Sequence, residues 1–217
     1  MGIFTKTPMT FAEVHEEDDG VHAFSFVPTK PLSFVAGQHG VLKVPGAGQK
    51  TFSLASAPED PEVVIATRLQ SGSAYKNALA ALRPNDPVTL QGPMFNFTLK
   101  GTPEDVVFLA QGIGITPFRS ILRHISAAGV AKRTHLVHVS GTQTPTYRAE
   151  TQDLATTALY PTQRDDFALA VKELVAEKPG AVYFVSGATD FLKGTVEQLT
   201  QLGVGKKQIR KDRFVGY

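Results

Sequence analysis

The residue pattern changes near the middle of the chain, and this change limits the folds that the sequence can adopt. Before residue 100, short alternating runs lie between Pro and Gly turns, which is typical of an antiparallel barrel or sandwich. After Gly101–Pro103, apolar runs alternate with helical patterns, which indicates a parallel α/β sheet. We therefore expect an antiparallel β-barrel domain at residues 1–102 and an α/β domain at residues 103–217.

The first half is expected to be a barrel with one helix. That helix, Ser73–Leu82, would place Tyr75 and Leu79 on one apolar face, would stop before Pro84, and would cover an open end of the barrel. The strands are predicted at Phe11–His15, Val21–Val27, Gly40–Val44, Thr51–Ala55, Val63–Leu69 and Pro87–Gln91.

The second half begins with a predicted buried strand, Val106–Ala110, a loop, Gln111–Ile115, and a helix from Pro117 to about Ala127. Proline favours the first helical position, which Pro117 would occupy, and Thr116 just before it suits the N-cap. Further strands are expected at His135–Ser140 and Ala181–Val185, and further helices at Asp166–Lys178 and Thr189–Leu202.

Composition excludes several kinds of function. The net charge is only +2, so no global field favours nucleic acid or an anionic membrane. The chain has no cysteine, which excludes disulfides, thiolate metal sites and protein-ligated iron–sulfur clusters. Any redox chemistry therefore needs a bound organic cofactor. No signal peptide or long apolar run is present, so we expect a cytoplasmic protein without membrane insertion.

Metal and hydrolase motifs are also missing from the sequence. His135 and His138 are three residues apart on a predicted strand, so they face opposite sides and cannot share a metal. No Gly-x-Ser-x-Gly elbow occurs, and Gly205 lacks the glycine-rich lead-in of a P-loop. We predict no metal site.

Two segments could each cradle a phosphate group. Gly112-x-Gly114 follows a strand and opens a helix, which favours an anion, although a tight structural turn would fit equally well and Pro117 replaces the third glycine of the dinucleotide fingerprint. Ser73 opens the other helix, with Lys76 one turn in and Arg68 upstream, but this serine could also serve the helix alone.

An aromatic residue beside a hydroxyl, Phe52-Ser53 in QKTFSLASA, suits a flat redox ring, although a phenylalanine on a strand is by default a core residue. This pair lies in an ordered set of motifs that resembles the ferredoxin–NADP(+) reductase-like flavoprotein family. The set is Gly37-Gln38, Lys50–Ser53, Gly72–Lys76, Gly92-Pro93, Gly112–Pro117 and Asp212–Tyr217, and it spans nearly the whole chain.

The resemblance implies that FAD lies between a flavin-binding barrel and a nicotinamide-binding α/β domain. Phe52 would stack on the isoalloxazine, and the Ser53 hydroxyl would hydrogen-bond near N5. The flavin would also be held by Lys50, Thr51, Thr67, Arg68, Gly72, Ser73, Ala74, Tyr75 and Lys76, with the helix start holding the pyrophosphate.

For NAD(P)H, the resemblance implies a pyrophosphate site at the loop with Gly112, Gly114, Thr116 and Pro117. Ser186 stands where many relatives have a cysteine beside the nicotinamide, so Ser53 and Ser186 are the predicted catalytic positions. Tyr217 would shield the flavin ring until nicotinamide displaces it.

Some residues depart from the family pattern. Lys50 replaces an arginine and loses its bidentate fork, and Phe95 stands where relatives often have glycine, a change that could fill space near the cofactor. The segment from Thr151 to Gly180 is shorter than usual, so a strand or loop is expected to be missing. Arg148 is the first cation after strand His135–Ser140, and this leaves NADH and NADPH both open.

The predicted function is that of an FAD-dependent oxidoreductase that takes hydride from NAD(P)H and passes electrons to a separate acceptor, such as a small redox protein. Two alternatives stay open: a reductase that releases reduced flavin, and a non-catalytic flavin-binding regulatory subunit. Neither the acceptor nor the oligomeric state follows from the sequence.

Overall fold

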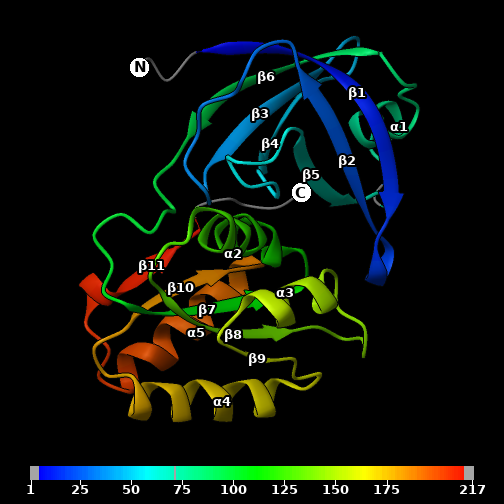
Figure 1. The fold of residues 1–217 in the computed structure, drawn as a ribbon. Helices are drawn as coiled ribbons and strands as arrows, with labels where there is room; N and C mark the ends of the chain where they lie inside the picture. Colours follow the sequence, from blue (N-terminus) through cyan, green and yellow to red (C-terminus); the bar gives the residue numbers. More distant parts are fainter. Residues whose placement is uncertain (1–4, 71, 213–217) are drawn as a thin grey trace.

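The computed structural model describes residues 5–70 and 72–212, and these form two sheets stacked along the molecule (Figure 1). The N-terminal sheet is a nearly closed antiparallel barrel with strand order β4-β3-β6-β1-β2-β5. Its strands are β1 Lys6–Glu16, β2 Val21–Pro28, β3 His39–Val44, β4 Gly48–Ser53, β5 Val63–Arg68 and β6 Pro87–Met94.

Alternation along β1 decides which side chains fill the barrel. Thr7, Met9 and Phe11 are buried, whereas Lys6 faces solvent. Phe11 lies opposite Phe26 of β2, and the rings pack edge to face at 5.8 Å. The connection between β1 and β2 turns through a 3-10 element, Asp18–Gly20.

Two barrel elements differ from their predicted bounds. β4 begins and ends earlier than the predicted strand Thr51–Ala55 because Gly48, with φ 90°, closes the turn from β3 and so sets the register. The helix α1 is Ala74–Ala80, shorter than predicted, and its N-cap is Ser73, whose side chain accepts a hydrogen bond from the Lys76 amide.

The C-terminal sheet is parallel, with strand order β11-β10-β7-β8-β9. One face is covered by α2 and α3, and the other by α4 and α5, as the two core clusters show. Its elements are β7 Asp105–Gln111, α2 Thr116–Ala128, β8 Arg133–Val139, α3 Arg148–Leu154, β9 Thr157–Leu159, α4 Arg164–Glu177, β10 Val182–Ser186, α5 Thr189–Gln201 and β11 Ile209–Lys211.

The α/β half corrects several details. Thr116 is not the N-cap of α2: residues Gly112–Ile115 form a 3-10 turn, Ile115 is the N-cap, and Thr116 is the first helical residue. Three short elements, α3, β9 and β11, were not predicted, and β9 lies within the segment expected to lack a strand or loop.

Helix α2 lies between the two sheets and joins them (Figure 1). Arg123 donates to both carboxylate oxygens of Asp60, and the Ser120 hydroxyl donates to the Ser56 carbonyl at 2.7 Å. The loop after β4 is therefore fastened to α2. No helix within the described ranges combines the length and apolar character needed to cross a membrane.

Candidate functional site

A cavity of about 750 Å³ opens where the barrel meets the α/β sheet. Its volume falls in the range of small-molecule and cofactor sites, about 300–1,000 Å³. Residues from both halves of the chain line it, and most of them were predicted from sequence. The predicted residues at the cavity are Lys50, Phe52, Ser53, Thr67, Arg68, Ser73, Tyr75, Lys76, Gly112, Gly114, Thr116 and Ser186.

The remaining predicted positions lie elsewhere. Thr51, Gly72, Ala74 and Pro117 are not part of the cavity lining. Thr51 alternates outward on β4, and Pro117 is buried inside the first turn of α2. Tyr217 lies outside the described residues.

The barrel side of the cavity is an aromatic wall. Phe52 belongs to the barrel core and also lines the cavity, so it fits both the functional and the structural interpretation. Its ring lies 6.1 Å from that of Tyr75, tilted by 30°. The Tyr75 hydroxyl donates to the Leu42 carbonyl at 2.9 Å, and burial raises the pKa of this phenol. A fixed apolar surface of this kind suits a planar ring.

Beside this wall lies a cluster of three cations, Lys50, Arg68 and Lys76. Burial, together with the charges of Arg68 and Lys50, lowers the pKa of Lys76. Like charges gathered at a half-enclosed site repel one another, and an anion bound there would offset that repulsion. The cluster therefore fits a diphosphate, although Ser73 itself already caps α1.

The opposite side of the cavity is the glycine loop between β7 and α2. Gly112 has φ 50°, and a side chain there would meet the Arg68 guanidinium at 3.5 Å, so the loop lies against the cation cluster. His138 Nε2 lies 2.9 Å from the Gly112 carbonyl oxygen. His135 instead contacts Asp105 and Thr157, so only His138 of the two contacts the glycine loop.

Packing against the end of β10 requires a glycine at position 114. A Cβ atom there would lie 2.4 Å from the Ser186 carbonyl oxygen, which no real structure tolerates. The close approach brings the loop against the end of β10, where Ser186 lines the cavity. The Thr116 hydroxyl donates to the Ile113 carbonyl at 3.1 Å and so braces the same turn. These contacts support the structural interpretation of the loop, and its anion-binding role stays a prediction.

Some lining residues were missed by sequence reasoning. Ala66 comes from β5 of the barrel. The others come from the ends of β7 and β10, the start of α5 and the segment after β11, which the parallel sheet gathers at one edge. The missed residues are Ala66, Gln111, Ile113, Gly187, Ala188, Thr189 and Asp212. Asp212 belongs to the C-terminal motif, and this membership was the available signal.

A buried polar chain connects the two predicted catalytic serines. Ser53 Oγ lies 3.0 Å from His39 Nε2, which in turn lies 3.0 Å from Asp212 Oδ1. Ser186 Oγ donates to Asp212 Oδ2 at 3.0 Å. His39 was missed because it is a single histidine within a strand, yet it lies directly opposite Ser53 in the β3–β4 register.

Phe95 does not line the cavity. It is 45% exposed, has φ 65°, and its ring stands edge-on to His39 at 5.3 Å. The expectation that Phe95 fills space beside the cofactor is therefore not supported. Its ring instead covers His39, which lies behind the cavity wall.

Arg148 does not settle the choice of nicotinamide nucleotide. It donates to the Gln143 carbonyl and lies 5.0 Å from the Tyr160 ring centre, so its guanidinium is engaged with its own segment.

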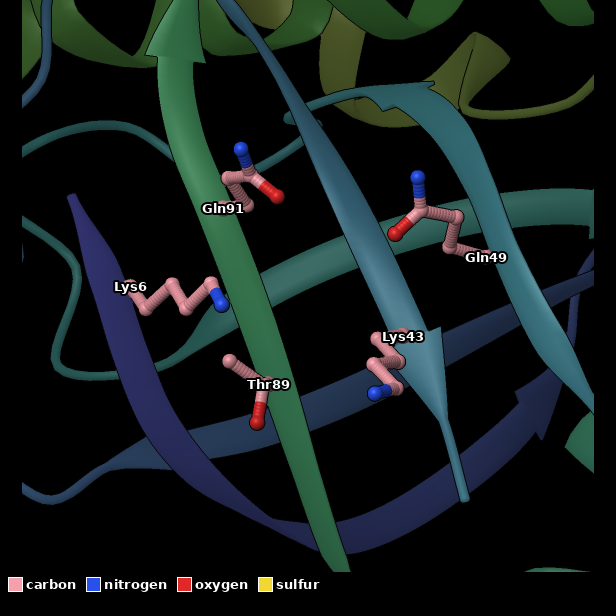
Figure 2. Close-up of a pocket in the computed structure, with 5 residues that line it drawn as sticks. All are labelled: Lys6, Lys43, Gln49, Thr89 and Gln91. Carbon is pink, nitrogen blue, oxygen red and sulfur yellow. The ribbon is translucent and has the colours of Figure 1, made fainter. Parts of the chain in front are cut away.

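A smaller hollow of about 180 Å³ lies on the outer face of the barrel. Figure 2 shows its side chains rising from β1, β6, β3 and β4, and they are Lys6, Thr89, Gln91, Lys43 and Gln49. None of these residues was a predicted site, and the apolar wall and glycine loop that mark the large cavity are absent from this lining.

This combination of a barrel, a parallel sheet and an inter-sheet cavity defines the ferredoxin reductase-like fold. No protein-family model matches the chain. Over 109 residues it is 33% identical to the toluate 1,2-dioxygenase electron transfer component of Pseudomonas putida, covering 49% of this chain and 32% of that protein. Over 114 residues it is 37% identical to ferredoxin–NADP reductase B of Sorangium cellulosum, covering 50% and 47%.

Among solved structures, phthalate dioxygenase reductase, a modular structure for electron transfer from pyridine nucleotides to [2Fe-2S], superposes with a TM-score of 0.80 at 20% identity. The match covers 96% of this chain and 67% of that chain. The resemblance inferred from sequence is thus confirmed, since the two relatives are an electron transfer component and a ferredoxin–NADP reductase, and the solved neighbour shares the fold. The chain aligns with a third to a half of the length of these two curated relatives.

Proposed function

We propose that the chain is an FAD-dependent reductase that takes hydride from NAD(P)H and passes electrons to a separate acceptor. The observation that carries this proposal is the cavity itself, which has an aromatic wall and a cation cluster on the barrel side and a glycine loop with Ser186 on the other. When bound, FAD would accept two electrons from the nicotinamide and release them one at a time.

The residues of the barrel would hold and orient the flavin. Phe52 offers its ring to the isoalloxazine, and Ser53 is placed beside it on β4. Lys50, Arg68 and Lys76 would offset the charge of the pyrophosphate. Most of the Lys76 side chain is packed against the protein, so its ammonium would be held in place in the half-enclosed site.

The residues of the α/β sheet would hold the nicotinamide nucleotide. Backbone N–H groups at Gly112–Ile115 lie at the start of α2, where the helix dipole favours a pyrophosphate. Ser186 and Asp212 at the sheet edge would adjoin the nicotinamide ring. Hydride transfer itself needs no general base, so the contribution of the chain is orientation and exclusion of water.

The proposed acceptor is a one-electron carrier such as a ferredoxin or an iron–sulfur oxygenase component. Similarity to an electron transfer component and to ferredoxin–NADP reductase supports this class of partner. The domain division at residue 102, a cytoplasmic location and the roles of the individual site residues remain predictions.

Gel filtration of the FAD-loaded protein, followed by an assay with a [2Fe-2S] ferredoxin and either NADH or NADPH, tests the proposal. We expect the flavin to stay with the protein and the ferredoxin to be reduced. Loss of the flavin, with turnover only in the presence of excess free flavin, would instead show a flavin reductase. Protein that binds no flavin would overturn the proposal altogether.

A further inference from the structure

The hydrogen-bonded side chains of Ser53, His39, Asp212 and Ser186 form a polar network that is almost wholly shielded from solvent. His39 is 0% exposed and Asp212 4% exposed, and both serines are also buried. The ring of Phe95 covers His39 on one side. Hydrogen bonds between such buried groups are strong and hold fixed directions, because little of their surface is open to water.

One atom, His39 Nε2, lies 3.0 Å from both Asp212 Oδ1 and Ser53 Oγ. A carboxylate can only accept hydrogen bonds, so Nε2 must carry a proton to contact Asp212 favourably. A protonated Nε2 cannot accept the Ser53 hydroxyl proton. Ser53 Oγ can only accept from this nitrogen, in a bond shared with the carboxylate, and its own proton is directed elsewhere.

Ser186 has the opposite hydrogen-bonding role. Its hydroxyl donates to Asp212 Oδ2 at 3.0 Å, so its proton is committed and only its lone pairs remain. Both serines line the cavity. The carboxylate therefore gives two chemically identical side chains opposite roles, since Ser53 can donate a hydrogen bond into the cavity and Ser186 can accept one from it.

We infer that His39 is a positioning residue that, with Asp212, makes Ser53 a hydrogen-bond donor to the flavin and Ser186 a hydrogen-bond acceptor for the nicotinamide carboxamide. This inference rests on the proposed function, because it assigns these two groups to the cavity. Oxidised flavin presents a ring nitrogen, N5, that accepts hydrogen bonds, and the carboxamide presents an N–H that donates them. A donor at Ser53 matches flavin N5, and an acceptor at Ser186 matches the carboxamide N–H.

The first test needs no cofactor. The ¹⁵N chemical shifts of the histidine rings in the flavin-free protein report which ring nitrogen carries a proton, and the His39→Gln variant identifies the His39 signals by their loss. We expect Nε2 of His39 to be protonated at neutral pH. An unprotonated Nε2 would overturn the inference and would leave the proposed function untouched.

The second test reads the flavin contact directly, using FAD labelled with ¹⁵N at N5. Ser53→Ala is expected to move the N5 shift to the value of a nitrogen without a hydrogen-bond donor. His39→Leu should move it in the same direction, whereas His39→Gln, whose amide N–H can still donate to Asp212, should keep it near the wild-type value. A wild-type N5 shift in a folded His39→Leu protein would contradict the inference.

The third test concerns Ser186. Ser186→Ala is expected to weaken the binding of NAD(P)⁺ by about 2- to 10-fold, the usual value of one neutral hydrogen bond. The 3-acetylpyridine analogue lacks the amide N–H and should bind wild type and Ser186→Ala equally. An equal loss for both nucleotides would contradict the acceptor role. If the wild type retains no flavin at all, the proposed function fails, and the histidine signals still decide the protonation of Nε2.

Discussion

Arg123 on α2 makes a bidentate contact with Asp60 of the barrel half, with Nε 2.9 Å from one carboxylate oxygen and Nη2 2.6 Å from the other. Asp60 also accepts a hydrogen bond from the Ala57 amide at 2.7 Å. This contact fastens the loop after β4 to the helix whose first turn lines the cavity. It therefore links the stability of the protein to the shape of the site.

Asp60→Asn keeps the size of the side chain and removes its charge. We expect the free energy of unfolding to fall by about 1–3 kcal/mol, as is usual for hydrogen bonds to charged groups. Glu104→Gln is the matched control, because Glu104 and its partner Arg133 are both about half exposed and such pairs contribute about 0–1 kcal/mol. Urea unfolding of the three proteins measures the difference, and equal losses would show that the bidentate contact is unimportant.

The same pair gives a pH dependence. Burial alone would raise the pKa of Asp60, but hydrogen bonds from Arg123 and the Ala57 amide outweigh it and hold the pKa below its usual value. A carboxyl whose folded pKa is depressed stabilises the protein above its unfolded pKa of about 4 and loses that contribution as pH falls further. The stability advantage of wild type over Asp60→Asn should therefore be constant from pH 7 to pH 5 and shrink below pH 4. An advantage that grows on acidification would contradict this sign.

Lys76→Met tests the cation cluster. We expect FAD affinity to fall by about 10- to 100-fold, the value of one charge-assisted hydrogen bond, while the flavin-free protein melts at the same or a higher temperature, because repulsion with Lys50 and Arg68 is relieved. Lys43→Met, on the outer face of the barrel, is the control and should change neither quantity. Fluorescence titration with FAD and a thermal melt give the two values. A variant that melts lower and binds FAD normally would assign Lys76 a structural role.

Gly114→Ala tests the approach of the glycine loop to β10. The added methyl group would lie 2.4 Å from the Ser186 carbonyl, so the loop must move. We expect the KM for NAD(P)H to rise at least several-fold while FAD affinity changes little, because the flavin side of the cavity is built on other strands. Gly141→Ala, where nothing lies within 4 Å of the added carbon, should leave KM unchanged. Equal effects of the two substitutions would remove the packing explanation.

Local pattern was enough to predict most of the fold and much of the site. The buried run at Val106–Ala110 and the turn chemistry at Gly112 and Ser73 are determined by neighbours in sequence. The fold class and most of the cavity-lining residues followed from such signals together with the family resemblance.

The elements that sequence missed depend on tertiary contacts. Strands β9 and β11 are only three residues each, too short for a periodic pattern, and they exist because β8 and β10 offer them hydrogen-bonding edges. His39 is similar, because its role depends on Ser53 across the ladder and on Asp212, which lies far away in sequence. No local pattern records either contact.

The central claim is that a flavin bound between the two sheets accepts hydride from a nicotinamide nucleotide bound at the glycine loop. Anaerobic mixing of the FAD-loaded protein with NADH, and separately with NADPH, tests it by following the visible absorbance of the oxidised flavin. We predict that at least one nucleotide bleaches the flavin in a single turnover, and that Gly114→Ala slows the bleaching. Bound flavin that stays oxidised with both nucleotides would contradict the claim.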